Sequence, residues 1–164
     1  MGFLQNSNIS ASISWTQRDS TSSSTVIDSS SVEYLKLFAS GTGISQCDKV
    51  YYASGTLSSG QNQQFDLLNL QRSIFGSVQT ITFSGGKIKS FYLENGGSAQ
   101  CNLQNTGNNS FQFNFLGSGI ILWPSGYFSC SNLTGWNIST GNRYFGLINN
   151  TTGTVPYEIA ILGN

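Results

Sequence analysis

The sequence contains no histidine, few charged residues and no long apolar run. Histidine is the side chain that most often transfers protons near neutral pH, so its absence excludes a Ser-His-Asp or Cys-His nucleophilic site. A glycosidase could still use two carboxylates, but the seven acidic residues are spread through the chain without local pairing. We therefore expect neither enzymatic activity nor a bound cofactor.

Charged residues make up only 9% of the 164 positions, against about a quarter in an ordinary soluble domain. The seven basic and seven acidic residues give a formal net charge of zero, and the basic ones form no stripe or cluster. Binding to a phosphate backbone depends on clustered Lys and Arg. The composition therefore argues against direct nucleic-acid binding.

No stretch of apolar residues is long enough to cross a bilayer, and no charged segment followed by an apolar run opens the chain. We expect neither a membrane span nor a signal peptide. Cysteine is also scarce: Cys47, Cys101 and Cys130 are far apart and form no C-x-x-C pair. Without histidine, a zinc site would need all three thiolates and a carboxylate, so buried free thiols are the better interpretation and no metal is expected.

Gly, Ser, Asn and Thr are abundant, and aromatic residues reach 13%. Turn-forming residues separate short runs of aromatic and β-branched residues, which is typical of an all-β protein. From Lys49 onward about eight to ten such runs follow at intervals of 8 to 12 residues, which indicates a sandwich or barrel. We predict an antiparallel, jelly-roll-like β-sandwich whose last two runs form a terminal hairpin.

The N-terminal segment differs from the rest. Ile9, Ala11, Ile13 and Trp15 alternate with Ser and Thr, which predicts a half-buried strand. The Ser/Thr-rich stretch 19–31 is interpreted as a flexible loop or linker. We therefore divide the chain into an arm with its linker, residues 1–31, and a β-sandwich domain, residues 32–164. The arm either docks on a neighbouring molecule or adds an edge strand to the domain.

One segment, "FDLLNLQRSIFGS", has helical spacing. Leu67, Leu70, Ile74 and Phe75 occupy positions i, i+3, i+7 and i+8, which place them on one face of a helix. Asp66 before them can cap the helix, and a glycine after them can end it. We predict one short helix over residues 67–75 that closes an open end of the sandwich.

Several motifs follow one another along the chain: "FDLLNL" before the glycine at Gly76, then "KIKSFYLEN", "WPSGYF" and a closing "YEIAILG". Their order resembles that in a group of small β-sandwich proteins encoded among the structural genes of tailed bacteriophages. Members of that group have a D-L-x-x-L segment before a glycine, a strand ending in Val-Lys-x-Ile-x-Ile-x-Asn, a Pro-Gly turn and a C-terminal Tyr-x-Ile-x-Ile-x-Gly. The matching positions here are Asp66 to Leu70, Gly76, residues 89–95 and residues 157–163. The sequence departs from the pattern at "SGG", 84–86, and at Ser125, which separates Pro124 from Gly126.

The resemblance implies a virion structural protein that is assembled in the host cytoplasm. Within that class it implies a head decoration (cement) or minor capsid protein that binds the capsid surface and stabilises the head. Its partners would be the major capsid protein or other virion proteins. It would also bind copies of itself, and the resemblance favours a trimer.

A receptor-binding module that recognises host-surface glycans is the alternative. β-Sandwiches often bind sugars through exposed aromatics beside amides, whereas the competing interpretation places such aromatics in a core or subunit interface. Trp136 is the first candidate, because "LTGWNIST" has the composition of a polar loop. Trp123 belongs to the same set of aromatic residues but is not selected. The candidate residues for an interface or for glycan contact are Trp15, Trp136, Tyr127 and Tyr144.

Overall fold

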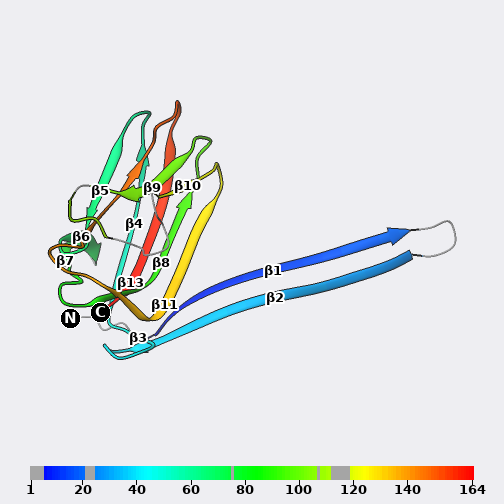
Figure 1. The fold of residues 1–164 in the computed structure, drawn as a ribbon, viewed down its shortest axis with the longest axis horizontal. Helices are drawn as coiled ribbons and strands as arrows, with labels where there is room; N and C mark the ends of the chain where they lie inside the picture. The colour runs from blue at the N-terminus through cyan, green and yellow to red at the C-terminus, as the bar shows by residue number, and fades with distance from the viewer. Residues whose placement is uncertain (1–5, 21–24, 75, 107, 112–118) are drawn as a thin grey trace.

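The computed structural model describes residues 6–20, 25–74, 76–106, 108–111 and 119–164. Within these ranges all regular structure is β, and the strands pair antiparallel except for one short parallel contact. The chain forms a two-layered body from which a long two-stranded ribbon projects (Figure 1). The predicted all-β sandwich is thus confirmed. No helix in the described part of the chain is long and apolar enough to span a membrane.

The body consists of two four-stranded sheets. The first has the order β11-β8-β13-β4 and the second the order β10-β9-β12-β5. The strands of the first sheet are β4 (Lys49–Leu57), β8 (Lys87–Asn95), β11 (Tyr127–Asn137) and β13 (Val155–Gly163). The strands of the second sheet are β5 (Asn62–Asp66), β9 (Cys101–Asn105), β10 (Ile120–Leu122) and β12 (Tyr144–Ile148).

The core lies between these two sheets, and strand alternation produces it. In β13, for example, Val155, Ile159 and Ile161 are fully buried while Glu158 between them is exposed. The sheets meet through aromatic rings: the ring of Phe145 stacks on Phe65 at a centroid distance of 4.9 Å and meets Phe91 of the opposite sheet edge-on at 5.6 Å. These contacts join β12 and β5 to β8 across the layers.

The predicted helix over residues 67–75 is wrong. β5 ends at Asp66 and β6 (Leu70–Ile74) begins four residues later. The Asp66 side chain accepts a hydrogen bond from the main-chain amide of Leu68 at 3.0 Å, but within a turn and not at the start of a helix. The carbonyl of Leu67, which a helix would pair with the amide of Gln71, instead accepts from the amide of Phe83 at 2.9 Å. A partner outside the segment therefore occupies the backbone group that the first helical hydrogen bond would need.

β6 forms a hairpin with β7 (Ser77–Ile81), in which Ile74 pairs with Ser77. Gly76 in the connection has a φ of 79°, a conformation that favours glycine. Leu67 and Leu70 from the predicted helical face are both buried in the core. Phe75 and the side chain of Ile74 lie outside the described part of the structure.

The N-terminal arm is an antiparallel ribbon of β1 (Asn6–Ser20) and β2 (Thr25–Ser40). The predicted strand at residues 9–16 is therefore confirmed, although Ile13 is 71% exposed, not half-buried. The loop predicted for 19–31 is wrong for 19–20 and 25–31, which belong to β1 and β2, and residues 21–24 are not described. Cross-strand hydroxyl pairs, such as Ser29 and Thr16 at 3.1 Å, explain why a Ser/Thr-rich segment can form a ribbon.

The domain boundary at residue 31 stays a prediction, and in the structure this position lies within β2. The predicted terminal hairpin is wrong, because β12 and β13 belong to different sheets. Their connecting segment crosses between the layers, and Asn149 holds it by donating to the carbonyls of Leu57 at 3.3 Å and Gly153 at 3.0 Å. One of the predicted strand runs after Lys49, "SFQFNF" at 110–115, lies mostly outside the described residues.

Candidate interaction site at the root of the arm

The root of the arm, where β2 turns into β3 (Gln46–Cys47), is bound to the body by several separate contacts. The Nδ2 atom of Asn164 donates to the carbonyl of Thr42 at 2.6 Å, and the amide of Ser45 donates to the carbonyl of Leu133 at 3.4 Å. Within the turn, the Gly43 amide donates to the side chain of Gln46 at 2.8 Å. Because these contacts come from different strands, they set the direction in which the arm leaves the body.

Lys89 contributes a further contact from beneath the turn. Its side chain is only 1% exposed, and its Nζ atom donates to the carbonyl of Gly43. A buried ammonium group is costly unless its hydrogens are bonded. The Lys89 contact therefore ties the β2–β3 turn to β8, in the middle of the first sheet.

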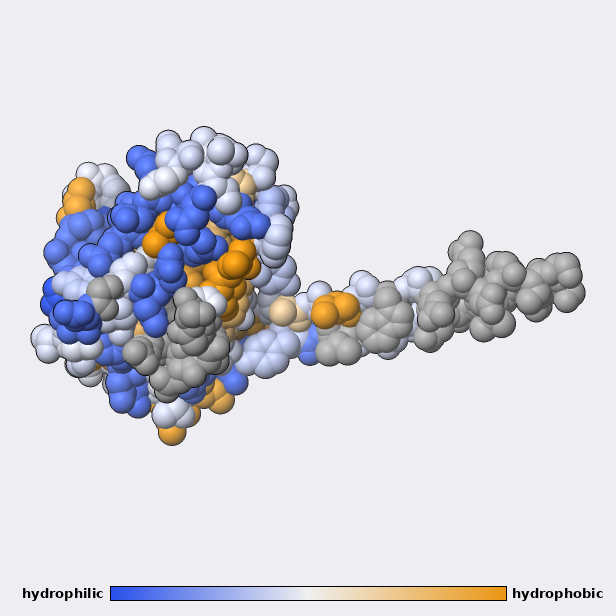
Figure 2. All heavy atoms as spheres, turned by 45° about the horizontal axis from the view of Figure 1, so that its top comes forward, coloured by the Kyte–Doolittle hydropathy of each residue, from blue (hydrophilic) through white to orange (hydrophobic). Residues whose placement is uncertain are grey.

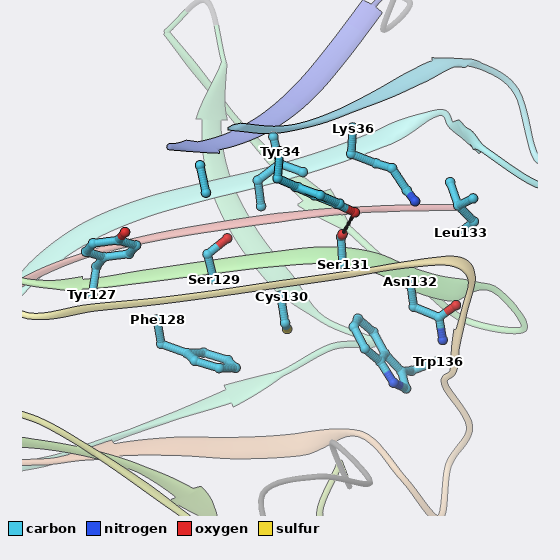
Figure 3. Close-up of a pocket in the computed structure, with 12 residues that line it drawn as sticks. Tyr34, Lys36, Tyr127, Phe128, Ser129, Cys130, Ser131, Asn132, Leu133 and Trp136 are labelled. Atoms are coloured by element: carbon cyan, nitrogen blue, oxygen red, sulfur yellow. Dashed lines mark hydrogen bonds between the residues drawn. The ribbon is translucent and has the colours of Figure 1, made fainter. Parts of the chain in front are cut away.

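The arm also crosses close to β11. The hydroxyls of Tyr34 and Ser131 share a hydrogen bond of 3.0 Å, although the two residues are 97 positions apart in the sequence (Figure 3). This hydrogen bond lowers the pKa of Tyr34 below its ordinary value. β11 is an edge strand that pairs with β8, and in the described residues no other strand pairs along its second side.

A groove of about 1080 Å³ lies between the arm and β11, and we call it the arm groove. Its walls are Ile9, Ala11, Tyr34 and Lys36 of the arm, and residues 127–133 together with Trp136 of β11. Figure 3 shows Ser129 and Ser131 pointing toward the arm and Phe128, Cys130 and Trp136 pointing to the opposite side of β11. Side chains from both sides of the strand line the arm groove, so it follows the free edge of β11.

The two faces of the ribbon differ. The register of β1 and β2 places Ile9, Ala11 and Ile13 on the same face as Tyr34, which is the face that lines the arm groove. Ile13 continues this face beyond the body into solvent. On the other face, Leu35 and Leu37 are exposed opposite Ser10 and Asn8. In the space-filling view, apolar residues are visible on the body beside the arm and again on the arm (Figure 2).

Two of the four predicted contact residues line the arm groove. Tyr127 is 63% exposed and its ring stacks on that of Tyr92 at 6.2 Å. Trp136 also borders the groove, but it lies in β11, not in a loop, and packs partly against the core. A register shift between Ser131 and Trp136 accommodates the polar segment, and Gly135 allows it because a Cβ there would come within 2.7 Å of Lys87.

The other two candidates lie elsewhere. Trp15 is in β1 with its Cα opposite that of Ser30, and its side chain lies outside the described part of the structure. Tyr144 is on β12 of the second sheet, where the guanidinium of Arg143 lies 4.5 Å from the ring centroid. Arg143 also forms an ion pair with Asp66 at 3.0 Å. Tyr144 therefore belongs to a local contact distant in topology from the arm groove.

Trp123 is not among the four predicted contact residues, although it is 65% exposed. It begins the turn before β11, where the Gly126 amide and the Asn95 side chain both donate to its carbonyl, at 2.9 and 3.1 Å. A Trp followed by Pro-Ser-Gly was a usable signal, because the turn residues hold the backbone while the indole remains outside. Tyr34 was missed because its partner, Ser131, is remote in the sequence.

The remaining reactive side chains include three thiols and a cross-strand pair of carboxylates. All three cysteines are free, and burial raises the pKa of the Cys47 and Cys101 thiols to about 11 and that of Cys130 to about 12. On the outer face of the first sheet, Glu94 and Glu158 are cross-strand neighbours. Among the described residues, no group of three or more His, Cys, Asp or Glu side chains is placed to hold a metal ion.

No protein-family model matches the sequence, and no curated protein matches it. Among solved structures, a chain described as part of the cyanophage Pam1 capsid asymmetric unit superimposes with a TM-score of 0.39 at 13% sequence identity. The superposition covers 70% of this chain and 82% of that chain. A TM-score this low does not establish a common fold.

Proposed function

We propose that this chain is a structural protein of a bacteriophage virion, and more specifically a capsid decoration (cement) or minor capsid protein. The observation that carries this proposal is the arm, which is anchored by Lys89 and Asn164 at its root yet exposes apolar side chains along its length. An arm with a set direction is suited to contacting neighbouring subunits on a lattice. Many such contacts, each weak, add up to stable attachment.

The strand order of the body supports the same class, and we assign it as a jelly roll. In chain order, β4 and β5 lie in different sheets, as do β8 and β9, β10 and β11, and β12 and β13. β13 lies between β8 and β4, while β12 lies between β9 and β5, so the strands are nested in the two-sheet pattern that capsid domains use. Because one fold can host many functions, the strand order supports the proposed function only together with the arm and the sequence resemblance.

The partners under this proposal are the major capsid protein or other virion proteins, and further copies of the chain, three being the number that we favour. The seven basic residues form no cluster along the sequence of the kind that binds nucleic acid. Contacts would instead use apolar and hydroxyl side chains such as those of the arm groove. The protein would be located in the virion after assembly in the host cytoplasm.

The test is to count this chain in purified virions of the phage that encodes it. Quantitative mass spectrometry should find copies comparable in number to the major capsid protein. Particles made without the gene should release their DNA at a lower temperature, and supplying the gene in trans should restore the normal release temperature. Absence from purified particles, or only a few copies at the tail, would overturn the decoration role.

A glycan-binding adhesion module is the second candidate, favoured by one specific observation. Trp123 and Tyr127, at the two ends of one turn, are both largely exposed, and Tyr127 is stacked on a second ring. A glycan array with the purified chain tests this function. Reproducible binding that is lost in both Trp123→Ala and Tyr127→Ala would establish it. Trp136→Ala is the poorer variant because Trp136 packs against the core.

A further inference from the structure

Much of the ribbon extends beyond the contacts that hold it. Ile9 and Ala11 line the arm groove, but β1 continues to Ser20, and Ile13 is largely exposed. At about 3.3 Å per residue, the nine residues after Ala11 reach roughly 30 Å past the groove. An isolated two-stranded ribbon is marginally stable in water at best. The distal arm therefore needs a partner surface.

The arm cannot supply that surface to itself, because it projects away from the body (Figure 1). The body, however, carries a matching surface: the second side of β11 has no paired strand in the described residues, and the arm groove runs along it. Unpaired strand edges readily accept an added strand, whose alternate side chains enter a neighbouring groove. The distal segment begins with that alternation, because Ile13 and Trp15 occupy alternate positions among Ser12, Ser14 and Thr16.

We propose that the distal arm of one copy docks along the free edge of β11 in a second copy, with the Ile13 face of the ribbon directed into the arm groove. The proximal part of the same ribbon face already contacts β11 of its own chain through Tyr34. A continuation of that face meets the same chemistry on another copy: apolar walls and the hydroxyls of Ser129 and Ser131.

Charge does not oppose this association. The formal net charge is zero, so copies of the chain experience little mutual repulsion. Each copy offers one arm and one groove, so two copies can exchange arms about a two-fold axis, or several copies can pass them around a closed ring. Either closed arrangement leaves no arm uncovered. The proposal concerns the purified chain alone, so it stands independently of the virion role.

Mixed-disulfide formation tests the docking directly. Ile13→Cys protein is mixed with Ser129→Cys protein that carries a mass tag, under mild oxidation. A tagged heterodimer is expected, because a disulfide between these variants forms only between two copies. The control partner is Val78→Cys on β7, which lies beside β4 at the opposite edge of the first sheet. Wild-type protein is a second control for the native Cys130.

Ile13→Asp provides a second test, because Ile13 is largely exposed and its replacement leaves the fold of the body intact. Light scattering and sedimentation should show that wild-type chain associates. Ile13→Asp should weaken the association at least tenfold, the loss expected when one buried apolar side chain is removed. Ser14→Asp on the other ribbon face should change it less than threefold. A monomeric wild type, or mixed disulfides no more abundant than with Val78→Cys, would overturn the proposal.

Discussion

Replacing Phe145 with alanine should reveal whether the two sheets are held together mainly by their aromatic contacts. Phe145 is fully buried, stacks on Phe65 at 4.9 Å and meets Phe91 at 5.6 Å. Removing a buried phenylalanine costs about 3–5 kcal/mol, and each lost ring pair accounts for about 0.5–1.5 kcal/mol of interaction beyond area. We expect a loss of about 4 kcal/mol, which is a large share of the about 5–15 kcal/mol available to a typical domain.

Urea unfolding followed by circular dichroism measures this loss, and a melt should show a fall in Tm of roughly 8–16 °C for a domain of this size. Trp123→Ala is the matched control, because it removes a ring that is 65% exposed and should change the free energy of unfolding by about 0.5 kcal/mol or less. A double-mutant cycle of Phe145 with Phe91 should give a coupling energy across the layers. A loss below about 1 kcal/mol for Phe145→Ala would refute the reasoning, since it would be close to the cost of a surface change.

Three other changes have defined outcomes. Asp66→Ala removes the cap on the Leu68 amide and should lower the free energy of unfolding by about 1–2 kcal/mol, measured by urea titration. Asp66→Asn keeps an acceptor and should cost less, so equal losses in the two variants would contradict the capping role. Tyr34→Phe removes the hydrogen bond to Ser131 and should speed amide hydrogen exchange near the arm root several-fold, measured by mass spectrometry, while exchange in the body stays unchanged. Equal exchange rates in wild type and variant would contradict a stabilising role for this hydrogen bond. The hydrogen bond to Glu94 raises the pKa of Tyr92 from 10.0 to about 12, so the stability that this bond contributes is present below pH 10 and is lost as the pH rises toward 12. Tyr92→Phe should flatten the dependence of the free energy of unfolding on pH, measured in urea titrations at several pH values.

Strand positions were predictable because their causes are local. The alternation of Val155, Tyr157, Ile159 and Ile161 with polar or small residues is readable without any knowledge of partners, and the structure places a strand there. The turn formers between the runs are equally local. The prediction of an all-β sandwich therefore rested on information that each short segment carries by itself.

The segment after Asp66 shows where local information ended. Asp66 caps a turn amide in the structure as it would in a helix, and Leu67 and Leu70 are buried as a helical face would bury them. A helix would pair the Leu67 carbonyl with the Gln71 amide, but in the structure that carbonyl accepts the amide of Phe83 at 2.9 Å. This partner lies outside the segment that carried the helical spacing, so the spacing alone could not reveal it.

Composition and short-range alternation were enough to establish the class of fold, the neutral charge and the lack of histidine chemistry. The sequence also showed that an N-terminal strand precedes the body. The three-dimensional arrangement was needed to show that this strand belongs to a projecting ribbon and that Tyr34 contacts Ser131. It was also needed to show that Tyr127 and Trp136 border one groove while Tyr144 lies elsewhere. These features could not be predicted because the arm groove is built from strands about a hundred residues apart in the sequence. Which distant strands meet depends on how the two layers pack.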